Sequence, residues 1–255
     1  MLKEERQQKI LDLLDEHTYL SIVDIAEKLE VSDMTIRRDI TELSQQKKLN
    51  KLYGGAQRLE ILEKERSTEE KIQSNVEEKK YIGRIMNSII PDNSTIFVGA
   101  GTTILYALPE IKRKNIFVTT NSLIAFNYLK EHTNYRILLS GGEFSPITEE
   151  FIGEVAIKAF ENLNIDIAFA ATNGVFEDNI TTAQFDEGAV QNAVFKKSKV
   201  RCVVADSSKL GVSDVYTFRR LSDIDYLITD NHISDNQLEY YGTYTEILKE
   251  EKKWL

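Results

Sequence analysis

The segment Ser32-Asp33-Met34-Thr35-Ile36-Arg37-Arg38-Asp39 decides the fold of the N-terminal part of this chain. Ser32 or Asp33 is a suitable helix N-cap, and apolar residues follow at helical spacing at Ile36, Ile40 and Leu43. The segment therefore predicts a helix that buries one apolar face. Thr35, Arg37 and Arg38 fall outside that apolar face.

A second helix is predicted just before this one. Ser21 is its expected N-cap, residues 22–29 carry its apolar face, and Glu30-Val31-Ser32 forms a short turn. Another amphipathic helix is predicted over residues 2–14. Two helices joined by a turn this short, with Thr and Arg on the second, are typical of a helix-turn-helix that binds duplex DNA.

A two-stranded wing is predicted after these helices, over residues 49–58. The strands would turn near Gly54-Gly55 and carry Lys51 and Arg58 along the phosphate backbone. Hydroxyl and guanidinium groups suit base edges and phosphates. The expected DNA-binding residues are Ser32, Thr35, Arg37, Arg38, Lys51 and Arg58.

The distribution of charge supports this interpretation although the whole chain is acidic. The net charge is −9. Residues 36–58 contain six basic and two acidic side chains, a local charge of +4, which leaves −13 for the rest of the chain. The alternative is that the third helix only exposes a solvated charged face. Spacing, turn, wing and local charge together favour DNA binding over that alternative.

The length of 255 residues allows a small and a large domain. We predict a DNA-binding domain over 1–58, a charged linker over 59–80 and a second domain over 81–255. The sequence has no run of eighteen apolar residues and its start does not resemble a signal peptide, so we expect a cytoplasmic protein. Cys202 lies in an apolar run and is expected to be a buried small hydrophobe.

The second domain alternates short apolar runs with helical patterns. Strands are predicted at 94–98, 115–119, 135–139, 165–170, 200–205 and 226–229, and helices at 103–111, 123–131 and 187–198. This alternation predicts the α/β fold class, with a mostly parallel sheet covered on both faces. Such sheets bind ligands at the carboxyl ends of their strands.

Glycines and polar residues cluster after the predicted strands. They occur at 99–103, 119–122, 140–143, 172–174 and 206–209. Each cluster alone is consistent with a plain turn. Hydroxyls, amides and a lysine at every strand end together favour a polyhydroxylated anion, and a sugar phosphate fits this description.

These motifs carry a family resemblance over nearly the whole chain. Residues 32–39 and Gly54-Gly55-Ala56 resemble the winged helix of DeoR-family bacterial repressors, with Tyr53 where members usually have His. The second domain resembles that family's sensor domain, which is similar in fold to sugar-phosphate isomerases. The resemblance implies operator DNA and a sugar-phosphate effector as partners. It implies the ligand-binding residues Gly99, Gly101, Thr102, Thr103, Asn121, Gly141, Gly142, Asp186, Glu187 and Lys209.

One departure points to a subgroup. Many members have Asp where this chain has Gly99. With Gly141-Gly142-Glu143, Ile147-Thr148 and residues 151–154, this variant resembles the subgroup that controls lactose phosphotransferase genes in Gram-positive bacteria. The inducer of that subgroup is tagatose 6-phosphate. Fructose 1-phosphate or another sugar phosphate is the alternative.

An enzyme of the isomerase type is the competing hypothesis, with Asp186, Glu187 and Lys209 as acid, base and electrostatic stabiliser. The attached helix-turn-helix favours a regulator that is not an enzyme. We expect no cofactor and no metal site, because the three histidines lie far apart in the sequence. We also expect a homo-oligomer, dimer or tetramer, that leaves its operator when the sugar phosphate binds.

Overall fold

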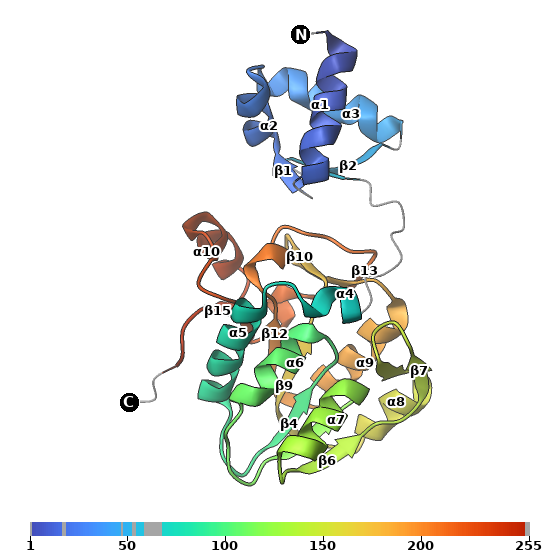
Figure 1. Ribbon diagram of the computed structural model, residues 1–255, viewed down its shortest axis with the longest axis vertical. Coiled ribbons are helices and arrows are strands. Elements are labelled where there is room, and N and C mark those ends of the chain that lie inside the picture. Colours follow the sequence, from blue (N-terminus) through green and yellow to red (C-terminus); the bar gives the residue numbers. More distant parts are fainter. Residues whose placement is uncertain (1, 17–18, 47, 53–54, 59–67, 253–255) are drawn as a thin grey trace. The chain divides into compact units, whose positions relative to one another are not determined.

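The computed structural model describes residues 2–16, 19–46, 48–52, 55–58 and 68–252 (Figure 1). The chain divides into two compact units, Met1–Lys64 and Glu65–Leu255. The predicted linker, 59–80, lies across this division. Its residues 59–67 are outside the described part. Residues 68–80 belong to the second unit and contain α4 (Thr68–Ile72) and the start of α5 (Val76–Ile89).

The first unit is a three-helix domain with a small antiparallel sheet. Its elements are α1 (Lys3–Glu16), β1 (Tyr19–Ser21), α2 (Ile22–Leu29), α3 (Asp33–Gln45), β2 (Leu49–Leu52) and β3 (Gly55–Arg58). The strand order is β1-β3-β2, so β3 of the predicted wing pairs both with β2 and with a third strand, β1, that pattern alone did not indicate. The helix-turn-helix prediction is confirmed.

Local capping explains where α2 and α3 begin. Ser21 Oγ accepts the backbone N–H of Asp24 at 3.1 Å, and Ser32 Oγ accepts that of Thr35 at 3.4 Å. Between them Glu30 adopts a left-handed conformation with φ 53°, which ends α2. Buried side chains from all three helices form one core, among them Ile10, Leu14, Ile25, Ile36, Ile40 and Leu43.

The second unit is built on a seven-stranded parallel sheet. Its strand order is β15-β14-β12-β9-β4-β5-β6, and every neighbouring pair is parallel. The strands are β4 (Thr95–Val98), β5 (Phe117–Thr120), β6 (Arg136–Leu139), β9 (Ile165–Ala171), β12 (Ser198–Val204), β14 (Tyr226–Ile228) and β15 (Glu246–Leu248). The predicted α/β class and the six predicted strands are confirmed.

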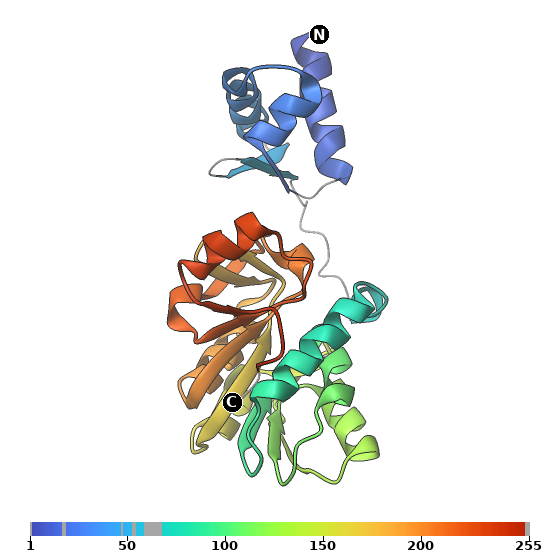
Figure 2. The same ribbon diagram turned by 90° about the vertical axis from the view of Figure 1, so that its left-hand side faces the viewer.

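Helices cover both faces of this sheet (Figure 2). One apolar cluster joins the sheet to α5, α6 (Thr102–Ala107), η1 (Leu108–Glu110) and α7 (Leu123–His132). The other joins it to α8 (Gly153–Phe160), α9 (Phe185–Phe195) and α10 (Asp235–Gly242). Both clusters are almost fully buried, so the sheet is the middle layer of three.

Shorter elements surround the carboxyl ends of the strands. The hairpin of β7 (Glu143–Ser145) and β8 (Glu150–Ile152) follows β6. A second antiparallel sheet contains β10 (Gly174–Phe176), β11 (Asn179–Thr182) and β13 (Tyr216–Arg220). The short helices η2 (Ser207–Lys209) and η3 (Leu221–Asp223) complete the unit. Within the described residues, no helix is long and apolar enough to span a membrane.

Candidate functional site

The outward face of α3 carries side chains suited to DNA. Met34 is 78% exposed, and Arg37 and Arg38 are also exposed. Met34, the two arginines and the half-buried Thr41 follow one another at intervals of about one helical turn. They share the face opposite the buried face that contains Ile36. A helix of this kind fits the major groove, where guanidinium groups contact guanine edges or phosphates.

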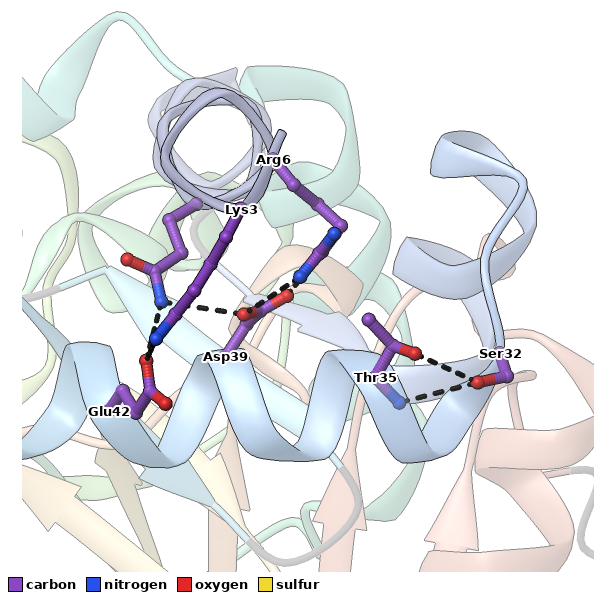
Figure 3. Close-up of polar contacts among 7 residues, drawn as sticks. Lys3, Arg6, Ser32, Thr35, Asp39 and Glu42 are labelled. Carbon is purple, nitrogen blue, oxygen red and sulfur yellow. Dashed lines mark hydrogen bonds and ion pairs between the residues drawn. The ribbon is translucent and has the colours of Figure 1, made fainter. Parts of the chain in front are cut away.

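A buried ion pair holds α3 against α1 (Figure 3). Asp39 is 1% exposed, and Arg6 Nε donates to its Oδ2 at 2.5 Å. Gln7 Nε2 donates to Asp39 Oδ1 at 3.4 Å and to Glu42 Oε2 at 2.9 Å, and Lys3 Nζ pairs with the same Glu42 oxygen at 2.5 Å. The hydrogen bond to Asp39 raises the pKa of Arg6, and that from Lys3 lowers the pKa of Glu42.

Ser32 and Thr35 form the start of α3. Their hydroxyl oxygens lie 2.9 Å apart, while Ser32 also caps the backbone N–H of Thr35 (Figure 3). Ser32 is exposed and Thr35 is half-buried. Both hydroxyls therefore lie at the helix N-terminus, a position that favours phosphate oxygens.

The wing is tied to α3 through Lys51. Its Nζ donates to Oγ1 of Thr41 at 2.9 Å, and that hydroxyl donates to the carbonyl of Arg37 at 2.7 Å. Arg58 pairs through its backbone with Leu49, and its side chain lies outside the described part, as do Tyr53 and Gly54. The structure thus brings Lys51 to the same face as Arg37, which sequence spacing alone did not establish.

A pocket of about 50 Å³ lies at the carboxyl edge of the parallel sheet in the second unit. The chain reaches this edge after β4, which leads into α6, and after β9, which leads into β10. The lining residues are Thr68, Lys71, Ala100, Gly101, Thr102, Thr148, Glu150, Ala171, Thr172, Asn173, Thr182, Glu187, Gln191 and Lys209. Four predicted ligand-binding residues therefore meet there: Gly101, Thr102, Glu187 and Lys209.

Lys209 is one of the two lysines in the pocket lining. Its Nζ donates to the carbonyl of Thr172 at 2.7 Å. Desolvation lowers the pKa of Lys209 from 10.5 to about 8, with Lys71 and Lys79 acting in the same direction and Asp206 opposing them. An anionic ligand would stabilise the charged ammonium form of Lys209, which desolvation disfavours.

Only part of the glycine-containing loop after β4 lines the pocket. Gly101 adopts φ +114°, a conformation that favours glycine, and it lines the pocket beside Thr102. Gly99 lies outside the lining, and its N–H donates to the carbonyl of Phe169 at 2.9 Å. Thr103 is fully buried outside the lining, and its Oγ1 has no hydrogen-bond partner among the described residues.

Four further predicted residues also lie outside the lining. Asn121 Nδ2 donates to Glu150 Oε2 at 2.7 Å, so Asn121 positions the carboxylate of a lining residue without lining the pocket itself. Gly141 and Gly142 form the turn before β7 with φ of +65° and +121°. A Cβ on Gly142 would meet the carbonyl of Ile152 at 2.7 Å, so packing explains this glycine. Asp186 is exposed on the first turn of α9.

Several lining residues were missed by sequence reasoning. Gln191 follows Glu187 by four positions on α9, so helical spacing could have identified it. Its Nε2 donates to the carbonyl of Ala171 at 3.2 Å, and its buried Oε1 has no hydrogen-bond partner among the described residues. Thr182 Oγ1 donates to Glu187 Oε2 at 2.6 Å. Lys71 fell in the predicted linker, and no local signal marked it.

A wider hollow of about 880 Å³ lies at the opposite edge of the sheet, at the amino ends of β5 and β6. Its lining includes Lys112, Arg113, Lys114 and Arg136. Arg113 donates to the backbone carbonyl of Asn87, and the other three are exposed. Parallel α/β sheets bind ligands at their carboxyl edge, so the smaller pocket is the stronger candidate site.

The described residues contain neither a metal-binding group nor an exposed thiol. Within the residues that the structure describes, no group of three or more His, Cys, Asp or Glu side chains is placed to hold a metal ion. Cys202 is fully buried, and burial raises its pKa well above the usual value.

Comparison with known proteins identifies both units. Residues 6–61 match the DeoR-like helix-turn-helix domain, and residues 74–231 match the DeoR C terminal sensor domain. The chain is 36% identical over 251 residues to the lactose phosphotransferase system repressor of Streptococcus mutans, covering 97% of this chain and all of that protein. It is 36% identical over 253 residues to the repressor of that name from Lactococcus lactis, covering 98% and 99%.

Solved structures give a weaker likeness. Ribose 5-phosphate isomerase from Plasmodium falciparum aligns over 52% of each chain at 19% identity, with a TM-score of 0.39. The sequence matches are far more extensive, since one family model alone covers residues 74–231. The chain belongs to the DeoR family, with its helix-turn-helix domain in the first unit and its sensor domain in the second.

Proposed function

We propose that this protein represses a sugar-utilisation operon by binding operator DNA through α3 and the wing, and that a phosphorylated sugar releases it. One observation carries the proposal. An exposed cationic helix and a lysine-lined pocket at a sheet's carboxyl edge occur in one chain whose full-length relatives bear the name lactose phosphotransferase system repressor.

The DNA contacts proposed are those of α3 and the wing. Arg37 and Arg38 contact base edges or phosphates, Ser32 and Thr35 contact the backbone, and Lys51 follows the phosphates beside α3. Arg58 is proposed as a further phosphate contact on the wing.

The effector proposed is tagatose 6-phosphate, in keeping with lactose or galactose catabolism. The pocket supports this class of ligand because it offers cationic donors in Lys71 and Lys209, a hydroxyl in Thr102 and a buried acceptor in Gln191 Oε1. A phosphate dianion would contact the ammonium groups, and a sugar hydroxyl would donate to Gln191. Fructose 1-phosphate has the same groups and is the alternative.

The repressor relatives and the helix-turn-helix unit favour a regulator over an isomerase. Glu187 accepts a hydrogen bond from Thr182 inside the pocket, while Asp186 lies exposed outside the lining. The two carboxylates are therefore not placed together as the acid and base that isomerisation requires. We propose that the pocket binds its ligand without turnover.

The proposed mechanism couples two binding equilibria. A homo-oligomer, dimer or tetramer, in the cytoplasm would place two α3 helices on half-sites about one DNA turn apart. The sugar phosphate would bind more tightly to the arrangement that does not fit the operator. A coupling of about 1–3 kcal/mol lowers operator affinity by roughly 5–150-fold.

Two measurements test the proposal. The first is selection of bound sequences from random duplexes, with enrichment of a paired half-site expected. The second is thermal stabilisation by tagatose 6-phosphate, fructose 1-phosphate and related esters, with product analysis of each mixture. Failure to enrich any sequence contradicts DNA recognition, failure of every ester to stabilise contradicts the sensor role, and turnover of an ester contradicts the absence of catalysis.

A further inference from the structure

The helix α4 is the first described element of the second unit, and residues 59–67 precede it in the chain. It precedes the matched sensor domain, which starts at residue 74. Thr68 and Lys71 of α4 nevertheless line the pocket. The helix nearest in sequence to the DNA-binding unit is therefore a wall of the candidate effector site.

Polar contacts hold α4 in this position. The backbone N–H and the hydroxyl of Thr68 donate to the carbonyl of Ile147 at 3.1 and 3.3 Å. Lys79 Nζ donates to the carbonyls of Lys71 and Ser74 at 2.9 and 2.6 Å. The apolar core clusters of the described part contain no residue of α4. A helix of five residues is unstable by itself, so these contacts determine where α4 lies.

Lysine side chains lie around α4, in a region where the pocket lining also includes the carboxylates of Glu150 and Glu187. Lys71 and Lys79 both lower the pKa of Lys209, and Asp206 is the carboxylate that opposes them. Lys79 is 2% exposed, and desolvation lowers its pKa as well. Lys71 Nζ donates to a neutral acceptor, Oδ1 of Asn173, at 3.3 Å. A phosphate dianion is a stronger acceptor for this ammonium than a side-chain amide.

The size of the pocket indicates which wall must move. Its volume is about 50 Å³, whereas sites for small ligands usually measure roughly 300–1,000 Å³. On the sheet side, the pocket is lined by Ala171, which is part of an apolar core cluster. On the α9 side it is lined by Glu187 and Gln191, and all three residues are less than 10% exposed. On the α4 side, the contacts described are the hydrogen bonds of Thr68 and Lys79, and no described α4 residue joins an apolar core cluster, so we expect its displacement to cost the least free energy.

We propose that Lys71 is an effector-binding residue and that α4 transmits occupancy of the pocket to the DNA-binding unit. This inference rests on the proposed sugar-phosphate function. The phosphate group replaces Asn173 as the acceptor of the Lys71 ammonium, and α4 shifts from Ile147 to make room for the sugar. Because α4 begins at Thr68, directly after residues 59–67, its displacement is passed to the DNA-binding unit through the chain itself.

The test uses the full-length chain and the panel ester that most stabilises it, with tagatose 6-phosphate as the first probe. Lys71→Met keeps the aliphatic stem and removes the ammonium, so we expect effector binding to weaken by about ten- to hundredfold. Lys71→Arg keeps the charge and is expected to bind within about threefold of wild type, which is the size expected when a charge-assisted bond is retained. Lys80→Met is the matched control, because Lys80 pairs with Glu77 and lies outside the pocket lining.

Hydrogen–deuterium exchange of the same proteins tests the movement of α4. Effector should change exchange in peptides covering residues 68–72 and leave α7 unchanged. If wild type binds no ester, the proposed function and this inference both fail. If wild type binds an ester and Lys71→Met binds it equally well, or if exchange at residues 68–72 does not respond, this inference alone is overturned.

Discussion

Arg6 Nε on α1 donates to Oδ2 of Asp39 on α3 at 2.5 Å, and Asp39 is 1% exposed. The two residues are 33 positions apart in the sequence, so the pair joins two helices. It fixes the rotation of α3, the helix that carries Arg37 and Arg38. A carboxylate buried this deeply is stabilised by its cationic partner, so the pair links the stability of the first unit to its proposed DNA contacts.

Arg6→Ala should therefore destabilise the first unit by about 2–3 kcal/mol, because it leaves the Asp39 charge buried with only Gln7 as a donor among the contacts described above. Hydrogen exchange of peptides covering α1 and α3 in the full chain measures this change. Adding Asp39→Asn should recover part of the loss, because a neutral amide costs less to bury. A double variant less stable than Arg6→Ala would contradict this explanation.

Arg38→Ala should abolish operator binding while leaving stabilisation by sugar phosphate intact. The guanidinium is exposed on the outer face of α3, so its loss removes DNA contacts without disturbing the core. Anisotropy with a selected duplex and thermal shift with an ester measure the two properties. Lys158→Ala, a substitution of a cation on α8 of the sensor domain, is the control. Normal DNA binding by Arg38→Ala would show that α3 is not the recognition helix.

Lys51→Met should weaken binding to all duplexes by a similar factor and reduce the slope of log affinity against log salt by about 1, as the loss of one phosphate contact does. Thr41→Val should have a smaller effect in the same direction, because it removes the hydroxyl that accepts from Lys51 at 2.9 Å. Binding across a salt series distinguishes this from base recognition. An unchanged slope would exclude a phosphate contact for Lys51.

Effector affinity should fall as the pH rises above about 8. The pKa of Lys209 is lowered to about 8, and a bound dianion raises it, so the complex takes up a proton and affinity decreases by up to about tenfold per pH unit in that range. Calorimetry at pH 7 and 9, in buffers of different ionisation enthalpy, measures the proton uptake. Lys209→Met should bind more weakly and lose this dependence. Equal affinity of wild type at both pH values would contradict the role of Lys209.

The same group has a predicted effect on stability without ligand. Its pKa in the unfolded chain is near 10.5, so between pH 8 and 10.5 the unfolded state binds more protons and the free energy of unfolding rises with pH. The total gain is at most roughly 3 kcal/mol. Unfolding in denaturant across this range, for wild type and Lys209→Met, isolates the contribution of Lys209.

The sequence predicted those parts of the fold that depend on local pattern. The apolar runs that became β4, β5, β6, β9, β12 and β14 are strands of the parallel sheet, and the caps Ser21 and Ser32 mark where α2 and α3 begin. The second sheet was not predicted, because β10 has three residues and β13 joins it from about forty residues later in the chain. Strands that short carry too little periodic signal to be recognised.

The candidate site was predicted less completely than the fold, because part of it depends on contacts between distant segments. Lys209, Glu187, Gly101 and Thr102 follow strand ends or begin helices, and they line the pocket. Burial of Asp39 and the entry of Lys71 into the pocket depend on contacts between distant segments, which no spacing reveals. Gly142 shows a different limit, since a Cβ there would meet the carbonyl of Ile152 at 2.7 Å, so packing accounts for a glycine that is predicted to bind the ligand.

The central claim is that one chain links operator binding to a sugar phosphate. Anisotropy of a selected operator duplex with the full-length protein, titrated with tagatose 6-phosphate and then with the other esters, tests it most directly. We predict that one ester lowers operator affinity by about 5–150-fold, and that Lys209→Ala binds the duplex normally but does not respond. Operator affinity that stays unchanged across the whole panel would contradict the account.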